Sequence, residues 1–234
     1  MRVSDRIVLG TRGSELARAQ TQLVESALRN AAPDLLVEVK IISTRGDEKS
    51  GREEPVDQWA GRKGLFTSAI ERALLDGKIH VAVHSAKDLP SDARAGLKIV
   101  TALPRAAVED VLVTKGDAGL ESVRLGGTVA TGSVRRQNQL RWVRPDLNVP
   151  ELRGNVPTRL RKLKENAWDG VILARAGLER LGFDCARGQI SFDGETLGVA
   201  VLSRAEFLPA GGQGIIALQV RADDGETRAM LDKL

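Results

Sequence analysis

The sequence has 234 residues, of which 42% are hydrophobic and 28% charged, a balance typical of a globular protein with a sizeable core. It contains no low-complexity tract, heptad run or fixed-period repeat, so disordered, fibrous and solenoid classes are excluded. The opening segment MRVSDRIVLG lacks the apolar stretch of a secretory signal, and no run of about 18 apolar residues occurs. With a single cysteine, Cys185, we expect a cytoplasmic protein without disulfides, membrane contact or a cysteine zinc site.

Short β-rich runs alternate with helical periodicity along the chain. The runs that predict strands are residues 6–10, 36–43, 81–85, 97–103, 111–114, 128–131, 147–152 and 170–174. Helices are predicted after Ser14 and over residues 64–75, 133–143, 156–165 and 175–181. This alternation predicts an α/β protein whose sheets are mostly parallel, with helices on both faces.

The first predicted helix has a clear start. Ser14 is a good N-cap, because its hydroxyl can accept a hydrogen bond from a free backbone N–H of the first turn. The apolar face of this helix is expected to include Leu16, Ala19 and Leu23.

Basic residues concentrate between residues 135 and 164, where nine arginines and lysines oppose only Asp146 and Glu151. One interpretation is a solvated helix face, and another is a nucleic-acid site. Four phenylalanines, three tryptophans and no tyrosine leave little for base stacking, which argues against nucleic acid. Arginine binds carboxylates and phosphates through paired hydrogen bonds, so a small polyanion is the favoured ligand.

Four short clusters are suited to anion binding. They are TRGS (11–14), HSAKDLP (84–90), TGSVRR (131–136) and RGNVPTR (153–159). They lie at predicted junctions between loops and helices, where free backbone N–H groups favour anions beyond the carboxyl ends of strands. For TGSVRR, the alternative is an ordinary helix start with two exposed arginines.

Asp88 is the candidate catalytic residue. A carboxylate among arginines can stabilise a developing cation or move a proton, and the alternative is an aspartate that only fixes its own turn. His80 and His84 lie four residues apart without a third ligand at zinc spacing, so no metal site is expected. No phosphate loop, dinucleotide fingerprint or nucleophile elbow is present.

Together, these clusters resemble hydroxymethylbilane synthase, also called porphobilinogen deaminase. The matching stretches, in the order of the family, are TRGSELARAQ (11–20), TRGDE (44–48), GRKGLF (61–66), HSAKDLP (84–90), TGSVRRQNQL (131–140), ELRGNVPTRLRKL (151–163), LARAGLERLG (173–182) and LPAGGQG (208–214). They extend over nearly the whole chain, which makes the resemblance specific.

The resemblance implies two domains, each like those of periplasmic binding proteins, around an interdomain cleft. The first is expected to comprise residues 1–104 and 208–234, and the second residues 105–207. The implied reaction condenses porphobilinogen head to tail with release of ammonia, giving the linear tetrapyrrole of porphyrin and heme biosynthesis. Each pyrrole carries an acetate and a propionate, which accounts for the arginines.

The resemblance also assigns roles to residues. Asp88 matches the aspartate that stabilises the cationic pyrrole, and Lys63 falls in the flexible lid region. The positions that match cofactor or substrate contacts are Arg12, Ser14, Gln20, Lys87, Thr131, Ser133, Arg135, Arg136, Arg153, Arg159 and Arg180. Gly132 stands where the family usually has serine, and the stretch 185–207 is longer than usual and has no clear counterpart.

The end of the sequence departs from the family pattern. Members continue into a third domain, in which a Gly-Gly-Cys motif carries a dipyrromethane cofactor through a thioether. This sequence ends at Leu234, and Cys185 lies in the different context GFDCARG. We therefore expect the third domain to be absent and dipyrromethane to be held without a covalent bond, or lost. The alternative to an enzyme is a non-catalytic protein that binds pyrroles or polycarboxylates, and a monomer is expected in either case.

Overall fold

The computed structural model describes residues 6–43, 64–91, 94–100 and 103–234. The chain divides into two compact units, residues 1–105 with 214–234 and residues 106–213. Residues 208–213 group with the second unit. None of the helices in these ranges is long and apolar enough to cross a membrane.

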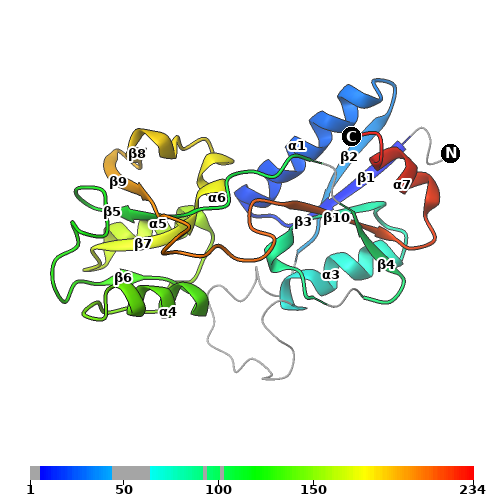
Figure 1. Cartoon of the computed structure of the whole chain (residues 1–234). Coiled ribbons are helices and arrows are strands. Elements are labelled where there is room, and N and C mark those ends of the chain that lie inside the picture. Colours follow the sequence, from blue (N-terminus) through cyan, green and yellow to red (C-terminus); the bar gives the residue numbers. More distant parts are fainter. Residues whose placement is uncertain (1–5, 44–63, 92–93, 101–102) are drawn as a thin grey trace. The chain divides into compact units, whose positions relative to one another are not determined.

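The first unit contains a five-stranded sheet with the order β2-β1-β3-β10-β4 (Figure 1). Its strands are β1 (Arg6–Thr11), β2 (Leu36–Ile41), β3 (Val81–Ser85), β4 (Leu97–Val100) and β10 (Ile216–Arg221). Strand β1 runs parallel to β2 and β3, so the carboxyl ends of β1 and β3 lie at one edge. Strand β10 runs antiparallel to its neighbours β3 and β4.

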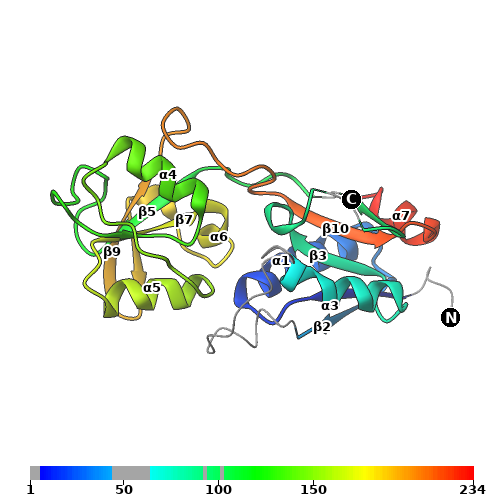
Figure 2. The same cartoon turned by 90° about the horizontal axis from the view of Figure 1, so that it is seen from below.

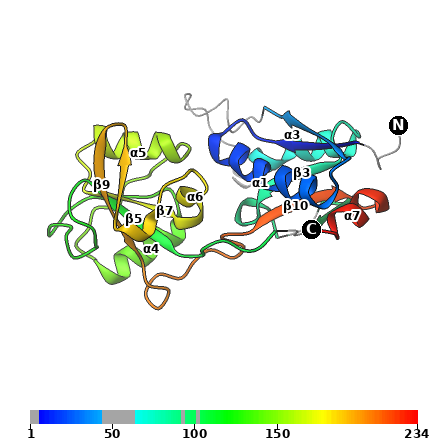
Figure 3. The same ribbon diagram turned by 90° about the horizontal axis from the view of Figure 1, so that it is seen from above.

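Helices cover both faces of this sheet. They are α1 (Glu15–Ala31), α3 (Gly64–Leu75) and α7 (Gly225–Leu231). Helix α3 lies in front of the sheet when the unit is seen from below (Figure 2), and α1 lies in front of it when the unit is seen from above (Figure 3). The side-chain alternation of β1 agrees, because Ile7 and Leu9 pack in one cluster with Val24 and Leu28 of α1, whereas Val8 packs with α3.

Helix α1 begins as predicted, because Ser14 Oγ accepts a hydrogen bond from Ala17 N at 3.3 Å. Of the apolar positions named from the sequence, Leu16 and Ala19 are partly buried and Leu23 is 46% exposed, whereas the buried α1 residues are Gln20, Thr21, Val24 and Leu28. Two of these are polar and have partners, since Thr21 Oγ1 donates to Ala17 O at 2.9 Å and Gln20 bonds to β3. Polar residues that satisfy one another can face the sheet, which hydrophobic periodicity does not anticipate.

The second unit has a sheet with the order β6-β7-β5-β9-β8. Its strands are β5 (Asp110–Thr114), β6 (Val129–Ala130), β7 (Gly170–Ala174), β8 (Gln189–Phe192) and β9 (Glu195–Val201). Only the β6–β7 pairing of this sheet is parallel, whereas β5–β7, β5–β9 and β8–β9 are antiparallel. Both sheets are therefore mixed, and the expectation of mostly parallel sheets is wrong.

Strands that were not predicted account for part of this difference, because every pairing of β8, β9 and β10 is antiparallel. The rest comes from β5 and β7, two predicted strands that pair antiparallel. No element was predicted after residue 181, but β8 and β9 form a hairpin there and β10 follows. The hairpin turns at Asp193 and Gly194, whose φ angles of 46° and 78° are those that an Asp-Gly pair favours in a two-residue turn. This dipeptide between two β-rich runs was the signal for the hairpin.

Helices also cover both faces of the second sheet (Figure 2). They are α4 (Val134–Val143), α5 (Val156–Glu165) and α6 (Arg175–Glu179). Leu112 of β5 packs in a cluster with Leu140 of α4, whereas its neighbours Val111 and Val113 pack with Leu160 of α5.

The predicted strand at 147–152 does not form. Only Asn148 makes a β-bridge, with Thr128, and the segment then continues as irregular backbone beside β6. Pro150 has no N–H to donate to a ladder, which limits the pairing.

Candidate functional site

A polar hollow lies in the first unit, at the carboxyl ends of β1 and β3 and beside the start of α1. The residues that line it are Arg12, Ser14, Leu16, Ala17, Gln20, Val83, His84, Ser85 and Asp88. Four of the predicted site residues, Arg12, Ser14, Gln20 and Asp88, are thus brought together from two separate stretches of the chain. The N-terminus of α1 adds backbone N–H groups and a positive dipole end, which favour an anion.

The floor of the hollow is held by a reciprocal contact between α1 and β3. Gln20 Nε2 donates to Ser85 Oγ at 3.0 Å, and Ser85 Oγ lies 3.2 Å from Gln20 Oε1. Gln20 is buried, and Thr11 at the end of β1 donates to Ala17 O at 3.2 Å. These bonds fix the first turns of α1 against the ends of both strands.

Asp88 ends the short 3-10 helix Ala86–Asp88 that follows β3. Backbone hydrogen bonds close this turn, from Leu89 N to Ala86 O at 3.1 Å and from Ala86 N to Ile215 O at 3.1 Å. Leu89 is buried beneath the turn, whereas Asp88 is exposed. The carboxylate is therefore accessible to a small molecule in the hollow.

His84 lies on β3 just before this turn. Burial lowers the pKa of His84 from 6.5 to about 4, although the nearby Glu71 carboxylate opposes the shift. Its Nε2 has no hydrogen-bond partner within the part of the chain that the structure describes. His84 is therefore a neutral side chain at neutral pH.

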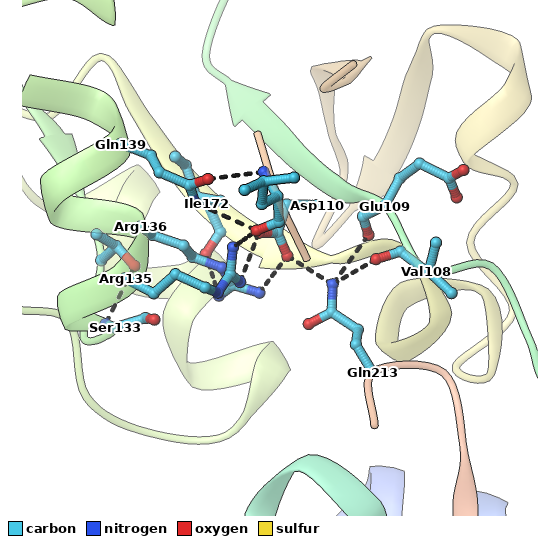
Figure 4. Close-up of polar contacts among 11 residues, drawn as sticks. Val108, Glu109, Asp110, Ser133, Arg135, Arg136, Gln139, Ile172 and Gln213 are labelled. Atoms are coloured by element: carbon cyan, nitrogen blue, oxygen red, sulfur yellow. Dashed lines mark hydrogen bonds and ion pairs between the residues drawn. The ribbon is translucent and has the colours of Figure 1, made fainter. Parts of the chain in front are cut away.

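The second group of predicted residues surrounds a buried carboxylate, Asp110, at the start of β5 (Figure 4). Arg135 Nη2 donates to Asp110 Oδ2 at 2.7 Å, and Arg136 Nη2 donates to Asp110 Oδ1 at 2.7 Å. The Asp110 side chain is fully buried, that of Arg136 is 6% exposed and that of Arg135 is 26% exposed. The two arginines of TGSVRR are therefore an ion-paired unit of the fold.

A third donor reaches the same carboxylate. Gln213 Nε2 donates to Asp110 Oδ1 at 2.8 Å and to Val108 O at 2.7 Å (Figure 4). Burial alone would raise the pKa of Asp110, but the charge of Arg136 and the hydrogen bonds from Arg136, Gln213 and Arg135 outweigh it and lower that pKa. Asp110 is therefore ionised at neutral pH.

Backbone carbonyls hold the other side of each guanidinium. Arg136 Nη1 donates to Ile172 O at 3.0 Å, and its buried Nε has no partner among the residues described. Arg135 Nη1 donates to Leu208 O, whose residue also bonds to Gln139 through its backbone N–H at 2.6 Å. Both side chains therefore have defined orientations.

The loop before α4 approaches the loop before α5 closely. Thr131 is buried, and its Oγ1 accepts a hydrogen bond from Ser133 N at 3.3 Å. A Cβ added at Gly132 would lie 2.3 Å from Leu152 O, a backbone atom. Glycine at this position thus permits the contact between the two loops.

The remaining predicted arginines lie in the second unit. Arg153 forms a bidentate pair with Glu151, at 3.0 and 3.2 Å, and Arg159 Nε donates to Gly154 O at 2.7 Å near the start of α5. Arg180 follows α6, and burial lowers its pKa. Lys87 lies beside Asp88 in the first unit, and Lys63 is outside the described residues.

Sequence reasoning missed Asp110 and Gln213. Asp110 directly precedes the apolar run Val111–Val113, and an acidic residue at the start of a buried strand needs cationic partners. The excess of arginine after residue 135 offered such partners. Gln213 lies in LPAGGQG and had no comparable signal.

The chain matches a family model described as "Porphobilinogen deaminase, dipyromethane cofactor binding domain" over residues 7–229. The chain belongs to the porphobilinogen deaminase family. It is 42% identical over 233 residues to porphobilinogen deaminase of Syntrophobacter fumaroxidans, covering 99% of this chain and 71% of that one. The protein of Roseiflexus sp. strain RS-1 is 45% identical over 228 residues, covering 97% and 71%. A probable porphobilinogen deaminase of Nitrosopumilus maritimus is 38% identical over 229 residues, covering 98% and 68%.

Solved structures with the same fold have low sequence identity to this porphobilinogen deaminase family member. The methionine-binding protein MetQ superposes with a TM-score of 0.57 at 13% identity, covering 98% of this chain and 90% of that one. The BenM effector-binding domain with benzoate gives 0.54 at 13% identity, with coverages of 98% and 90%. These similarities confirm the α/β fold of two periplasmic-binding-protein-like parts.

Proposed function

We propose that this chain is a transferase that condenses porphobilinogen units head to tail, with release of ammonia at each unit and addition of one water at the end, to give the linear tetrapyrrole hydroxymethylbilane. The observation that carries the proposal is the match to the porphobilinogen deaminase family over residues 7–229, together with an exposed Asp88 carboxylate beside Arg12 in the hollow. Porphobilinogen carries an acetate and a propionate, which suit cationic side chains and helix N-termini.

The substrate-binding groups that we propose combine charge with hydroxyl and amide groups. They are Arg12, Ser14, Gln20, Lys63, Lys87, Thr131, Ser133, Arg135, Arg153, Arg159 and Arg180, and Arg136 supports them through its ion pair with Asp110. Arg12 and Ser14 lie at the start of α1, where guanidinium, hydroxyl and backbone N–H donors converge. Such charge-assisted hydrogen bonds are worth about 1.5–3 kcal/mol each when water is excluded.

Asp88 is the proposed catalytic residue. When the aminomethyl C–N bond of porphobilinogen breaks, ammonia leaves and positive charge spreads over the pyrrole ring to its N–H. A carboxylate that accepts this N–H stabilises the cation as it forms. The α-carbon of a second pyrrole then forms the new C–C bond and loses its proton. The exposed position of Asp88 at the end of the turn suits this role.

The cationic donor set also fits dipyrromethane, the cofactor of the family, because this molecule carries four carboxylates. When bound, it supplies the first acceptor pyrrole. We propose that Arg135, Arg153 and Arg159 hold its carboxylates without a covalent bond, whereas Arg136 supports the site as the buried counter-charge of Asp110. Cys185 is unsuited to anchoring it, since its side chain is buried and burial raises the pKa of its thiol to about 11.

We further propose that the two compact units are the two domains of the enzyme, residues 1–105 with 214–234 and residues 106–213. The chain crosses between them after Arg105 and returns after Gln213. The cytoplasmic location and the monomeric state stay predictions from the sequence.

The test is incubation of the purified full chain, made in cells that synthesise porphobilinogen, with added porphobilinogen and dipyrromethane. Consumption of porphobilinogen, release of ammonia and uroporphyrin-type absorbance after oxidation are expected. A folded protein that binds porphobilinogen without consuming it would instead be a non-catalytic pyrrole-binding protein, and the proposal would be wrong.

A further inference from the structure

Asp110 is a carboxylate at the centre of a group of cationic side chains that are proposed to bind carboxylates. Its side chain is fully buried, and both of its oxygens are occupied, Oδ2 by Arg135 and Oδ1 by Arg136 and Gln213. A carboxylate of a ligand therefore does not easily displace Asp110 from these donors. Two guanidinium groups against one carboxylate leave one net positive charge for an anionic ligand.

Burial of a charge in this way is costly unless the charge is fully paired and hydrogen-bonded. Asp110 meets this requirement through three donors, at 2.7, 2.7 and 2.8 Å. Its backbone is also fixed, because Asp110 begins β5, pairs with Ala174 of β7 and accepts a hydrogen bond from Leu202 N at 2.9 Å. The backbone of Asp110 is thus held in place on a central strand of the sheet.

The two arginines that it holds differ in accessibility. Arg136 is 6% exposed and lies between Asp110 and Ile172 O, so its charge balances the buried carboxylate. Arg135 is 26% exposed and lies between Asp110 and Leu208 O. Arg135 is therefore the member of the pair that can present its guanidinium to a ligand.

We propose that Asp110 is a positioning residue, which orients the guanidinium of Arg135 toward a carboxylate of the pyrrole ligand. Arg136 compensates the charge of Asp110, and Gln213 fixes the orientation of its carboxylate. The identity of the ligand rests on the proposed function. The orientation of Arg135 by Asp110 is independent of the proposed function.

Replacement of Asp110 by asparagine has two opposite effects on ligand binding. Loss of the negative charge increases the local positive charge, which by itself strengthens binding of a carboxylate. Loss of the ion pair releases Arg135 from its orientation, which weakens binding. If Asp110 positions Arg135, Asp110→Asn should have a higher KM for porphobilinogen. If Asp110 only reduces the local positive charge, the variant should have a lower KM.

Asp146→Asn is the matched control. Asp146 also lies in the second unit and also forms a bidentate pair, with Arg144 at 2.7 and 2.8 Å, but it contacts none of the TGSVRR residues in the described bonds. We expect Asp110→Asn to raise KM about tenfold, equivalent to the loss of one oriented contact. Asp146→Asn should leave KM within about twofold of the wild type. An unchanged or lower KM in folded Asp110→Asn would overturn the inference.

A double-mutant cycle separates positioning from general destabilisation. Arg135→Met removes the group through which Asp110 is proposed to act, so Asp110→Asn should change KM by less than about twofold in that background. If the effects of Asp110→Asn and Arg135→Met on KM multiply in the double variant, Asp110 does not act through Arg135, and the inference is wrong. Where Asp110→Asn does not fold, Gln213→Met is the milder variant, because it removes only one donor to Asp110. Gln213→Met should raise KM about threefold, and an unchanged KM would contradict the inference.

NMR of isotope-labelled arginine side chains tests the same relationship without turnover. Rotation of the Arg135 guanidinium should be slow in the wild type and in Asp146→Asn, and fast in Asp110→Asn. A wild-type chain that shows this pattern but consumes no porphobilinogen would refute the proposed function and support the positioning role. Equally slow rotation in folded Asp110→Asn would refute the positioning role, whatever the activity.

Discussion

Arg136 donates to the fully buried Asp110 carboxylate at 2.7 Å, and its own side chain is only 6% exposed. Removal of one partner of a buried ion pair leaves an uncompensated charge, which costs about 3–5 kcal/mol. Arg135 shares the carboxylate but is about a quarter exposed, so water can replace part of its contribution. The adjacent arginines of TGSVRR therefore have different energetic roles.

Arg136→Met is expected to lower the free energy of unfolding by about 3–5 kcal/mol, and Arg135→Met by clearly less. Urea denaturation of the purified variants measures this difference. The exposed Arg141 of the same helix provides the control, because Arg141→Met should change stability by no more than about 0.5 kcal/mol. Equal costs for the Arg136 and Arg135 variants would contradict the assignment of Arg136 as the buried counter-charge.

Asp88→Asn is expected to reduce turnover of porphobilinogen by about 10²–10³, because the amide keeps the shape of the side chain but cannot offset a developing cation. Ligand binding and the unfolding transition should change little, since the carboxylate is exposed and backbone bonds close its turn. Asp34→Asn, at an exposed turn of the same unit, is the control and should retain full activity. Near-normal turnover of Asp88→Asn would leave Asp88 without a catalytic role.

The stability of the protein is expected to decrease as pH falls from 6.5 toward 4. Burial holds the pKa of His84 at about 4 against an ordinary value of 6.5, so between these values the unfolded state binds more protons than the folded state. The loss attributable to His84 reaches about 3 kcal/mol near pH 4. Urea denaturation at several pH values should show a shallower dependence for His84→Gln. The same slope in both proteins would show that other groups cause the effect.

Gly132→Ala is expected to destabilise the second unit by about 1–3 kcal/mol, because its Cβ would lie 2.3 Å from Leu152 O and one of the two loops must move. Gly116→Ala is the matched control in the same unit, where an added Cβ meets nothing within 4 Å. Thermal unfolding of the two variants provides the comparison. If both variants have the melting temperature of the wild type, the two loops can move apart without loss of stability.

Cys185 is expected to remain unmodified in the native protein. Its side chain is 2% exposed and its thiol pKa is raised to about 11, so little reactive thiolate is available. A thiol reagent should react only after unfolding, and the intact mass should be that of the bare polypeptide. An adduct with the mass of dipyrromethane that disappears in Cys185→Ser would identify Cys185 as the anchor and contradict the proposal of non-covalent holding.

Local features were predictable where the interactions that decide them are short in sequence. The predicted helices at 64–75 and 156–165 agree with α3 and α5, because periodicity and capping act within a few residues; Asn155 Oδ1, for example, accepts from Thr158 N at 2.9 Å. Long-range pairing was harder to anticipate. The irregular segment at 147–152 and the antiparallel direction of β10 depend on which strands become neighbours, and local pattern does not contain that information.

The sequence by itself determined the family, through motifs spread over nearly its whole length, and it located Arg12, Ser14 and Asp88 at the ends of predicted strands. Only the tertiary structure decided what the adjacent Arg135 and Arg136 contact. Their carboxylate lies 25 and 26 positions away in the chain, and Gln213 reaches the same carboxylate from 103 positions away. Contacts over such distances arise when the topology brings segments together in one core, so the physical reason for this pairing is burial of Asp110 and not any pattern near the arginines.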